Sequence, residues 1–71
     1  MHDDQFTTTG TVTECLRGFY RVKLSNGHTV LAYPSGRLRK ARIKCLPDDT
    51  VTVAVSSYDL DRARIVYRNA T

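Results

Sequence analysis

The chain has 71 residues and lacks tryptophan, and it contains only two cysteines and two prolines. No apolar run approaches the roughly 20 residues that a membrane-spanning helix needs. Residues 1–5 are polar and contain two aspartates, the opposite of a secretory signal peptide, so we expect a cytoplasmic protein. This length allows one domain that buries about 60% of its unfolded surface, which leaves little room for a substrate cleft beside the core.

The scarce cysteines and histidines do not form a metal-binding pattern. Cys15 and Cys45 are far apart in the sequence, and a small secreted domain normally carries more than one disulfide. His2 and His28 are equally isolated, whereas a zinc site needs close pairs of ligands. We expect two reduced, half-buried thiols and no metal or cofactor; a disulfide or a metal site is the less favoured alternative.

Catalytic patterns are also missing. There is no glycine-rich phosphate loop and no nucleophile with a nearby base. Apart from Glu14, the acidic residues lie in the N-terminal segment and in turn-like segments, where no pair is held beside a pocket. The sequence therefore speaks against an enzyme.

The strongest indication of function is a basic segment, residues 35–44, that contains no acidic residue. The net charge is +4 and the isoelectric point is about 9.4. Residues 35–44 contain five cations and no acid: Arg37, Arg39, Lys40, Arg42 and Lys44. Solvated helices usually mix glutamate with lysine, so we favour contact with a nucleic acid over a merely solvated face.

The hydrophobic pattern has a period of two, which is typical of half-buried strands. Strands are expected at residues 6–16, 19–24, 28–33, 50–56 and 63–68. A bend or bulge is expected at Gly10. Asn26-Gly27 predicts a type I′ turn, because both central positions of that turn need a positive φ.

A short helix is expected between the third and fourth strands. Pro34 ends the third strand, and Ser35 is a suitable N-cap for a helix from Gly36 to about Ile43. Its Leu38 and Ala41 are expected to touch the barrel. The strand residues expected to face the core are Tyr20, Val22, Leu24, Val30, Ala32, Val51, Val53, Val55, Ile65 and Tyr67.

Three strands, a helix and two strands is the element order of the OB-fold, a five-stranded Greek-key barrel. We expect a single all-β OB-fold domain at residues 6–69, between flexible tails at 1–5 and 70–71.

Two strands carry further candidates for RNA contact. Arg64, Val66 and Arg68 are expected on one face of the last strand, where residues two apart are about 7 Å apart, close to the spacing of successive phosphates. The alternative is a cationic edge that resists aggregation. Arg21 and Phe19 share the outer face of the second strand, where Phe19 is either a base-stacking residue or a partly covered hydrophobe.

Several short segments, in order, resemble one known family over essentially the whole chain. They are Gly10-Thr11-Val12, Phe19-Tyr20-Arg21-Val22, Ser25-Asn26-Gly27-His28, residues 35–40, Val51-Thr52-Val53, Tyr58-Asp59-Leu60 and residues 64–68. The series is similar to bacterial translation initiation factor one. The resemblance implies an S1-like OB-fold that binds the small ribosomal subunit as a monomer, at the decoding (A) site. It also implies contact with 16S ribosomal RNA beside a ribosomal protein, a block on premature tRNA entry, and cooperation with the other initiation factors.

The resemblance also implies residue roles. The basic segment after the third strand is expected to enter the RNA minor groove, which is wide, shallow and lined by 2′-hydroxyl groups. The RNA contacts implied by position are Arg37, Arg39, Lys40, Arg42, His28, Arg64 and Arg68. Tyr33-Pro34 departs from the family pattern of a histidine followed by an aliphatic residue, and Tyr33 can stack on RNA instead. Asp48-Asp49 replaces the usual Gly-Asp.

Two other functions use the same fold. A general single-stranded RNA-binding protein or RNA chaperone of cold-shock type exposes several aromatic residues, whereas Phe19 is the only good candidate here. A purely protein-binding OB module leaves the basic segment unexplained. An initiation factor is therefore the leading hypothesis.

Overall fold

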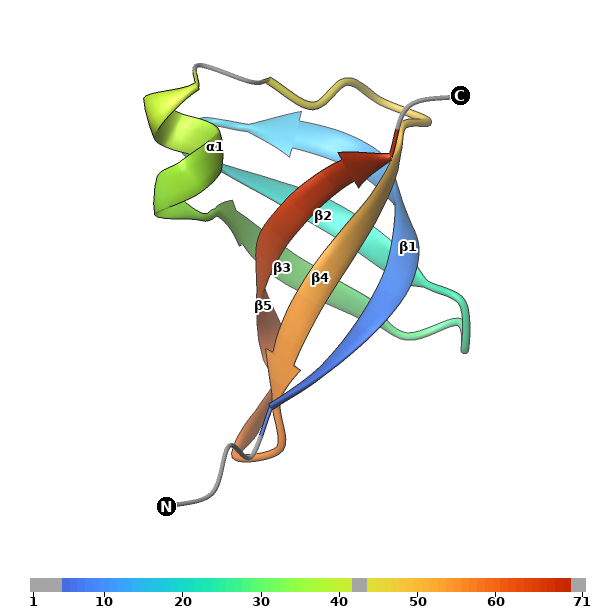
Figure 1. The fold of residues 1–71 in the computed structure, drawn as a ribbon. Helices are drawn as coiled ribbons and strands as arrows, with labels where there is room; N and C mark the ends of the chain where they lie inside the picture. The colour runs from blue at the N-terminus through green and yellow to red at the C-terminus, as the bar shows by residue number, and fades with distance from the viewer. Residues whose placement is uncertain (1–4, 42–43, 70–71) are drawn as a thin grey trace.

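The computed structural model describes residues 5–41 and 44–69 (Figure 1). Its elements are β1 (Gln5–Leu16), β2 (Phe19–Leu24), β3 (Thr29–Pro34), α1 (Gly36–Lys40), β4 (Thr50–Ser56) and β5 (Asp59–Asn69). The strands close into a barrel in the order β1-β2-β3-β5-β4. Only the β3–β5 pair is parallel. This arrangement confirms the expected OB-fold barrel with a helix between the third and fourth strands.

The parts of the chain outside this description are residues 1–4, 42–43 and 70–71, which include most of both expected tails. Within the described ranges, the one helix is far too short to cross a membrane.

The core fills the barrel and is almost entirely aliphatic. Its buried members are Val12, Val22, Leu24, Val30, Ala32, Leu38, Cys45, Val51, Val53, Val55, Ala63 and Ile65. Leu38 of α1 covers one end of the barrel: its side chain packs in the core and is only 2% exposed. Tyr20 packs against the cluster, and its hydroxyl oxygen lies 3.5 Å from the backbone nitrogen of Cys45, which donates to it. Nearly all the expected inward positions are confirmed.

Gly10 has a different role from the one that the sequence suggested. The bulge in β1 lies between Val12 and Glu14, where the pairing with β2 shifts register, and not at Gly10. A Cβ atom on Gly10 would stand 2.6 Å from Cγ1 of Val22 and 2.8 Å from the carbonyl oxygen of Lys23. The glycine therefore permits close approach of β1 to β2.

The turn between β2 and β3 is not type I′. Gly27 has a φ of 91°, but Asn26 has no positive φ. The amide of Gly27 donates to the carbonyl of Leu24 (2.9 Å), and Oδ1 of Asn26 accepts from the amide of His28 (2.9 Å). A turn followed by one left-handed glycine is a common hairpin connection, and here the asparagine contributes its side chain rather than its backbone.

Helix α1 is shorter than expected. The Ser35 cap is confirmed, since its Oγ accepts from the amide of Leu38 at 3.4 Å. The helix ends at Lys40, and Ala41 is the C-cap and is exposed, so it does not touch the barrel. With 3.6 residues per turn, a five-residue helix directs one side chain inward, and that side chain is Leu38.

β5 begins before the expected residue 63 and contains a second bulge. Thr52 pairs with Tyr67, whereas the next residue of β4, Val53, pairs with Ile65, so Val66 is the extra residue. The insertion reverses the alternation beyond it, and Tyr67 is 54% exposed rather than in the core.

The same bulge separates the two arginines of β5. Arg64 lies opposite Ala54 on the outer face, whereas Arg68 lies opposite Val51, whose side chain is fully buried. Opposite residues share a face, so the expectation that Arg64 and Arg68 lie on one face is wrong. Ala54 is only 8% exposed, although it alternates along β4 with the buried Val53 and Val55.

Candidate nucleic-acid interface

The cations of α1 form the centre of the candidate interface. Arg37, Arg39 and Lys40, here called the basic helix, are all exposed, and so is Lys44 in the following loop. Within residues 5–41 and 44–69, none of these four side chains forms an ion pair. Arg42, the remaining cation of the run, lies outside the described residues. The basic helix therefore presents positive charge without internal neutralisation.

Arg37 is held in place by Tyr67. Its guanidinium carbon is 5.6 Å from the centre of the tyrosine ring, and its Nη1 donates to the tyrosine hydroxyl at 3.3 Å. Cation–π contact and this hydrogen bond restrict the arginine before any ligand arrives, which lowers the entropic cost of binding.

Beside the helix, a row of side chains crosses the outside of the barrel. The Phe19 and Tyr33 rings are 5.6 Å apart, tilted by 39° and half-buried. Tyr33 pairs with Arg64 on the neighbouring strand. Phe19, Tyr33 and Arg64 are called the outer row. Aromatic faces beside an arginine can stack on bases and contact the connecting phosphates.

A shallow groove joins the outer row to the basic helix. It has a volume of about 380 Å³ and is lined by Ser35, Gly36, Arg37, Arg64, Val66 and Tyr67. Two cations and an aromatic ring thus converge between α1 and β5. The exposed position of Tyr67 could not be read from the sequence, because the only signal for it is the register shift at Val66.

Three other sequence candidates are engaged by carboxylates. Their pairs and N–O distances are Arg21–Glu14 (3.1 Å), Arg68–Asp49 (2.9 Å) and His28–Asp61 (3.3 Å). Exposed pairs of this kind contribute about 0–1 kcal/mol to stability, so they are readily exchanged for another anion. A phosphate that contacts one of these three side chains must first displace a carboxylate, whereas no described ion pair engages the basic helix.

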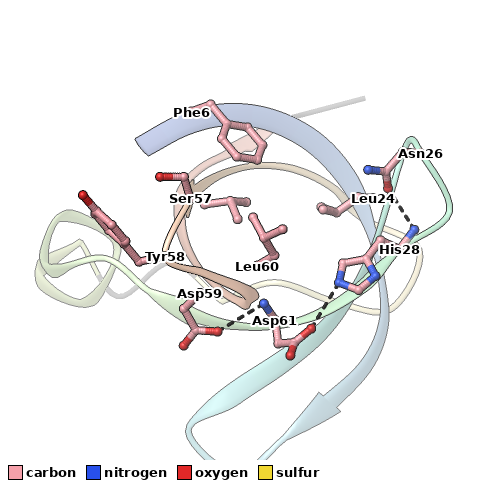
Figure 2. Close-up of a pocket in the computed structure, with 10 residues that line it drawn as sticks. Phe6, Leu24, Asn26, His28, Ser57, Tyr58, Asp59, Leu60 and Asp61 are labelled. Carbon is pink, nitrogen blue, oxygen red and sulfur yellow. Dashed lines mark hydrogen bonds and ion pairs between the residues drawn. The ribbon is translucent and has the colours of Figure 1, made fainter. Parts of the chain in front are cut away.

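His28 is not brought together with the basic helix. It precedes the first residue of β3, whereas α1 follows the last, and six residues of strand span about 20 Å. Figure 2 shows His28 at the rim of the opposite end of the barrel, with its ring directed to Asp61.

Arg68, at the end of β5, instead contacts the turn that precedes β4. Oδ2 of Asp49 accepts from the amide of Leu46 at 2.7 Å and from Nε of Arg68 at 2.9 Å. The backbone hydrogen bond from Leu46, assisted by the charge of Arg68, holds the pKa of the Asp49 carboxyl below its ordinary value. Arg68 thereby helps to close the barrel end near α1.

A closed five-stranded barrel with an unneutralised cationic helix and an outward aromatic pair defines an OB-fold protein of the RNA-binding class. Comparison with known families agrees over residues 2–71, which match the family described as translation initiation factor 1A / IF-1. The chain belongs to the translation initiation factor 1A / IF-1 family.

One solved structure supports the same assignment, and a second supports the fold. The chain is similar to the solution structure of translation initiation factor one from the Wolbachia endosymbiont strain TRS of Brugia malayi, with 33% identity and a TM-score of 0.78. That match covers 97% of this chain and 82% of the other. A second match, YjeQ from Thermotoga maritima, has a TM-score of 0.76 but 17% identity, and it covers 92% of this chain and 23% of that one. It supports the fold alone.

Proposed function

We propose that this initiation factor binds the small ribosomal subunit at the decoding (A) site, through ribosomal RNA. There it blocks premature entry of tRNA into that site and assists the other initiation factors. Protein synthesis takes place in the cytoplasm, which is where the protein acts. Family membership supports initiation as the process, and the site supports RNA as the ligand.

The main support for the proposal is that the exposed cations of α1 are not neutralised by any described carboxylate. The basic helix and Arg64 form no ion pair within the described ranges. Arg37 of that helix and Arg64 both line the groove beside Tyr67. Arginine and lysine side chains of this length can reach the 2′-hydroxyls and phosphates of a wide RNA minor groove. The proposed contacts are therefore Arg37, Arg39, Lys40, Arg42, Lys44 and Arg64, with Phe19 and Tyr33 stacking on bases.

Co-sedimentation with purified small subunits tests the proposal against a general RNA-binding function. The double substitution Arg39→Ala with Lys40→Ala should weaken subunit binding by at least about tenfold, since two charge-assisted contacts are lost. It should leave the melting temperature nearly unchanged, because both side chains are exposed.

The matched control is Lys23→Ala with Arg62→Ala, which removes the same charge from exposed strand positions away from α1. This control should lose much less affinity for the subunit. A similar loss in both variants would reduce the interaction to general charge attraction and contradict the proposal.

The second candidate is a general single-stranded RNA-binding or chaperone function. It is favoured by one observation: the rings of Phe19 and Tyr33 lie in contact, so the outer face carries a pair of aromatic side chains. Fluorescence anisotropy with an unstructured RNA separates the two functions. Equal affinity for that RNA and for the small subunit would favour the second candidate.

A further inference from the structure

The end of the barrel away from α1 has an open apolar mouth. A pocket of about 750 Å³ lies between the start of β1, the β2–β3 turn and the β4–β5 turn. Its floor contains Leu24 and Val55, which are 5% and 1% exposed, and its rim contains Phe6 and Leu60, which are 47% and 52% exposed. These four residues are called the apolar mouth. In Figure 2, Phe6, Leu24 and Leu60 point toward the middle of the opening.

The two ends of the barrel are therefore closed differently. At the α1 end, Leu38 covers the core. At the apolar mouth, no described side chain covers Phe6 and Leu60. Large apolar side chains exposed together at a concave site mark a place where a partner can bind, because covering them releases water from apolar surface. A pocket of this volume is large enough to receive a bulky side chain of a partner.

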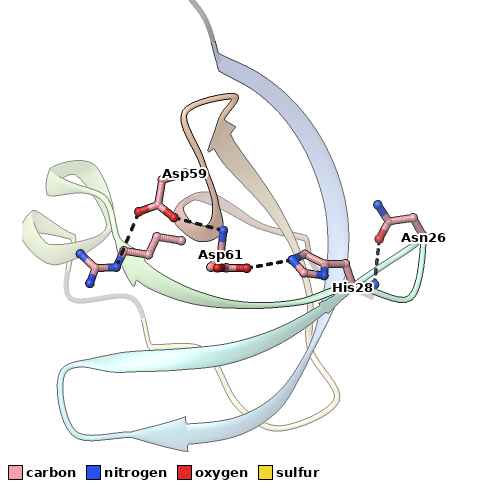
Figure 3. A network of polar contacts seen from close by, with 5 residues as sticks. Asn26, His28, Asp59 and Asp61 are labelled. Atoms are coloured by element: carbon pink, nitrogen blue, oxygen red, sulfur yellow. Dashed lines mark hydrogen bonds and ion pairs between the residues drawn. The ribbon is translucent and has the colours of Figure 1, made fainter.

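One side of the mouth is bordered by an ordered acidic rim (Figure 3). Oδ1 of Asp59 accepts from the amide of Asp61 at 3.2 Å, and Oδ1 of Asp61 lies 3.3 Å from Nε2 of His28. Oδ1 of Asn26 in turn accepts from the amide of His28. These bonds orient the carboxylates, while the side chain of Asp61 stays 83% exposed and available to a cation.

The charge of the rim selects the kind of partner. Asp59 and Asp61 face any group that enters from this side. Among the described residues, only Arg62, whose Nε is 3.8 Å from Oδ2 of Asp59, offsets them permanently, and His28 does so only when protonated. The phosphates of an RNA would be repelled by these carboxylates. A partner that matches the site therefore presents an apolar side chain with a cation next to it.

We propose that the apolar mouth docks a polypeptide segment that presents one bulky apolar side chain beside a lysine or arginine. The apolar side chain enters between Phe6 and Leu60, and the neighbouring cation meets Asp61. The site lies at the end of the barrel away from the basic helix, so RNA and this segment bind at the same time. The proposal stands independently of the RNA site.

Nuclear magnetic resonance of the full, isotope-labelled chain tests the docking directly. The probe is a short peptide with one central phenylalanine flanked by lysines. Amide shifts are expected at Leu24, Val55 and Leu60, with none in α1. Replacing the phenylalanine by serine, or the lysines by glutamates, should each weaken binding by at least about tenfold. Equal binding of the glutamate peptide would overturn the proposal.

Matched variants locate the site. Leu60→Ser should weaken binding of the lysine peptide at least about tenfold, whereas Leu46→Ser should change it less than about twofold, because Leu46 is 56% exposed at the other end of the barrel. Asp61→Asn should weaken binding severalfold and Asp48→Asn should not. Equal effects within either pair would overturn the proposal, and melting curves establish that all four variants fold.

Two other ligands of the apolar mouth would give results that differ from those expected for the peptide. A second copy of the chain would appear as concentration-dependent dimerisation in sedimentation equilibrium, abolished by Leu60→Ser. A single-stranded RNA would shift the amides of the mouth without peptide. Either result would overturn the proposal in favour of the other occupant.

Discussion

At the scale of single residues, Asp48 occupies a position better suited to glycine. Its φ is 72°, and no other described residue besides glycine has a positive φ. Its amide donates to the carbonyl of Val12 at 2.7 Å, while the carbonyl of Asp49 accepts from the amide of Val12 at 2.9 Å. These two bonds hold the turn before β4 against β1, so the strained backbone is fixed where the barrel closes.

Asp48→Gly should therefore raise the free energy of unfolding by about 0.5 kcal/mol. Left-handed backbone costs an L-residue roughly 1–2 kcal/mol, and the greater freedom of glycine in the unfolded chain offsets about half of that gain. Chemical denaturation measures the change. Asp48→Asn is the control, since it removes the charge and keeps the Cβ atom, and it should give no gain in the free energy of unfolding. Equal effects of both variants would attribute the gain to charge rather than backbone.

The two thiols differ more than the sequence indicated. Both cysteines are free; Cys15 is exposed and Cys45 is buried, so neither is half-buried. Sγ of Cys15 donates to the carbonyl oxygen of Cys45 at 3.5 Å. Burial, reinforced by the nearby carboxylate of Asp49, raises the pKa of the Cys45 thiol above its ordinary value.

Alkylation of the native protein should consequently occur in two phases. Only the thiolate reacts, so Cys15 should be modified at least about tenfold faster than Cys45 at pH 8, and the slow phase should accelerate as the pH rises toward 10. Mass spectrometry with iodoacetamide measures both rates, and unfolding in denaturant should make them similar. Cys15→Ser should remove the fast phase. A single phase in the native parent would contradict the assignment.

At the scale of elements, the pairing of β1 with β2 depends on Gly10. The Cβ atom of any other residue would overlap a neighbouring side chain and, more seriously, the carbonyl oxygen of Lys23 at 2.8 Å. A backbone oxygen in the sheet cannot turn aside as a side chain can, so the strands themselves would have to separate.

Gly10→Ala should destabilise the protein by about 1–3 kcal/mol, which is the usual cost of overpacking. Gly36→Ala is the matched control: nothing lies within 4 Å of its Cβ position, and alanine reduces the entropy of the unfolded chain. The control should raise the free energy of unfolding by about 0.4–1 kcal/mol. Thermal and chemical denaturation measure the stability of both variants. A decrease in the free energy of unfolding below about 0.5 kcal/mol for Gly10→Ala would show that β1 moves to accommodate the methyl group.

The sequence predicted the elements well and their irregularities poorly. Alternation predicted β2, β3 and β4 within one residue, and Ser35 predicted the start of α1, because these signals are local. The bulge at Val66 has no local signal, since it arises from the register between β4 and β5. For that reason Tyr67 was expected in the core, and the groove that it forms with Arg37 and Arg64 could not be foreseen.

At the scale of the whole molecule, the two ends of the barrel differ in their charge and in whether a helix covers the core. The end capped by α1 (Figure 1) carries the basic helix, while the open end carries Asp59 and Asp61 beside the apolar mouth. A polyanion therefore meets the α1 end first and with a defined orientation. Residues far apart in sequence, such as Tyr33 and Arg64, join that surface through the parallel β3–β5 pairing.

The dependence of ribosome binding on salt should show which cations meet phosphates. The five described candidates without ion pairs are Arg37, Arg39, Lys40, Lys44 and Arg64. If each of these and Arg42 releases counterions from one phosphate, the log–log slope of affinity against salt is roughly −4.2 to −5.4. Arg64→Ala should reduce the steepness by about 0.7–0.9, the contribution of one phosphate contact.

Arg68→Ala is the matched comparison, because it removes an equal charge from the same strand. Arg68 lies on the opposite face of β5 and is paired with Asp49, so its loss should leave the slope unchanged and lower the melting temperature. Fluorescence anisotropy of labelled protein with purified small subunits at several salt concentrations measures the slopes. If Arg68→Ala flattened the slope as much as Arg64→Ala, the RNA surface would have to extend around the capped end, and the faces assigned by the Val66 bulge would not govern binding.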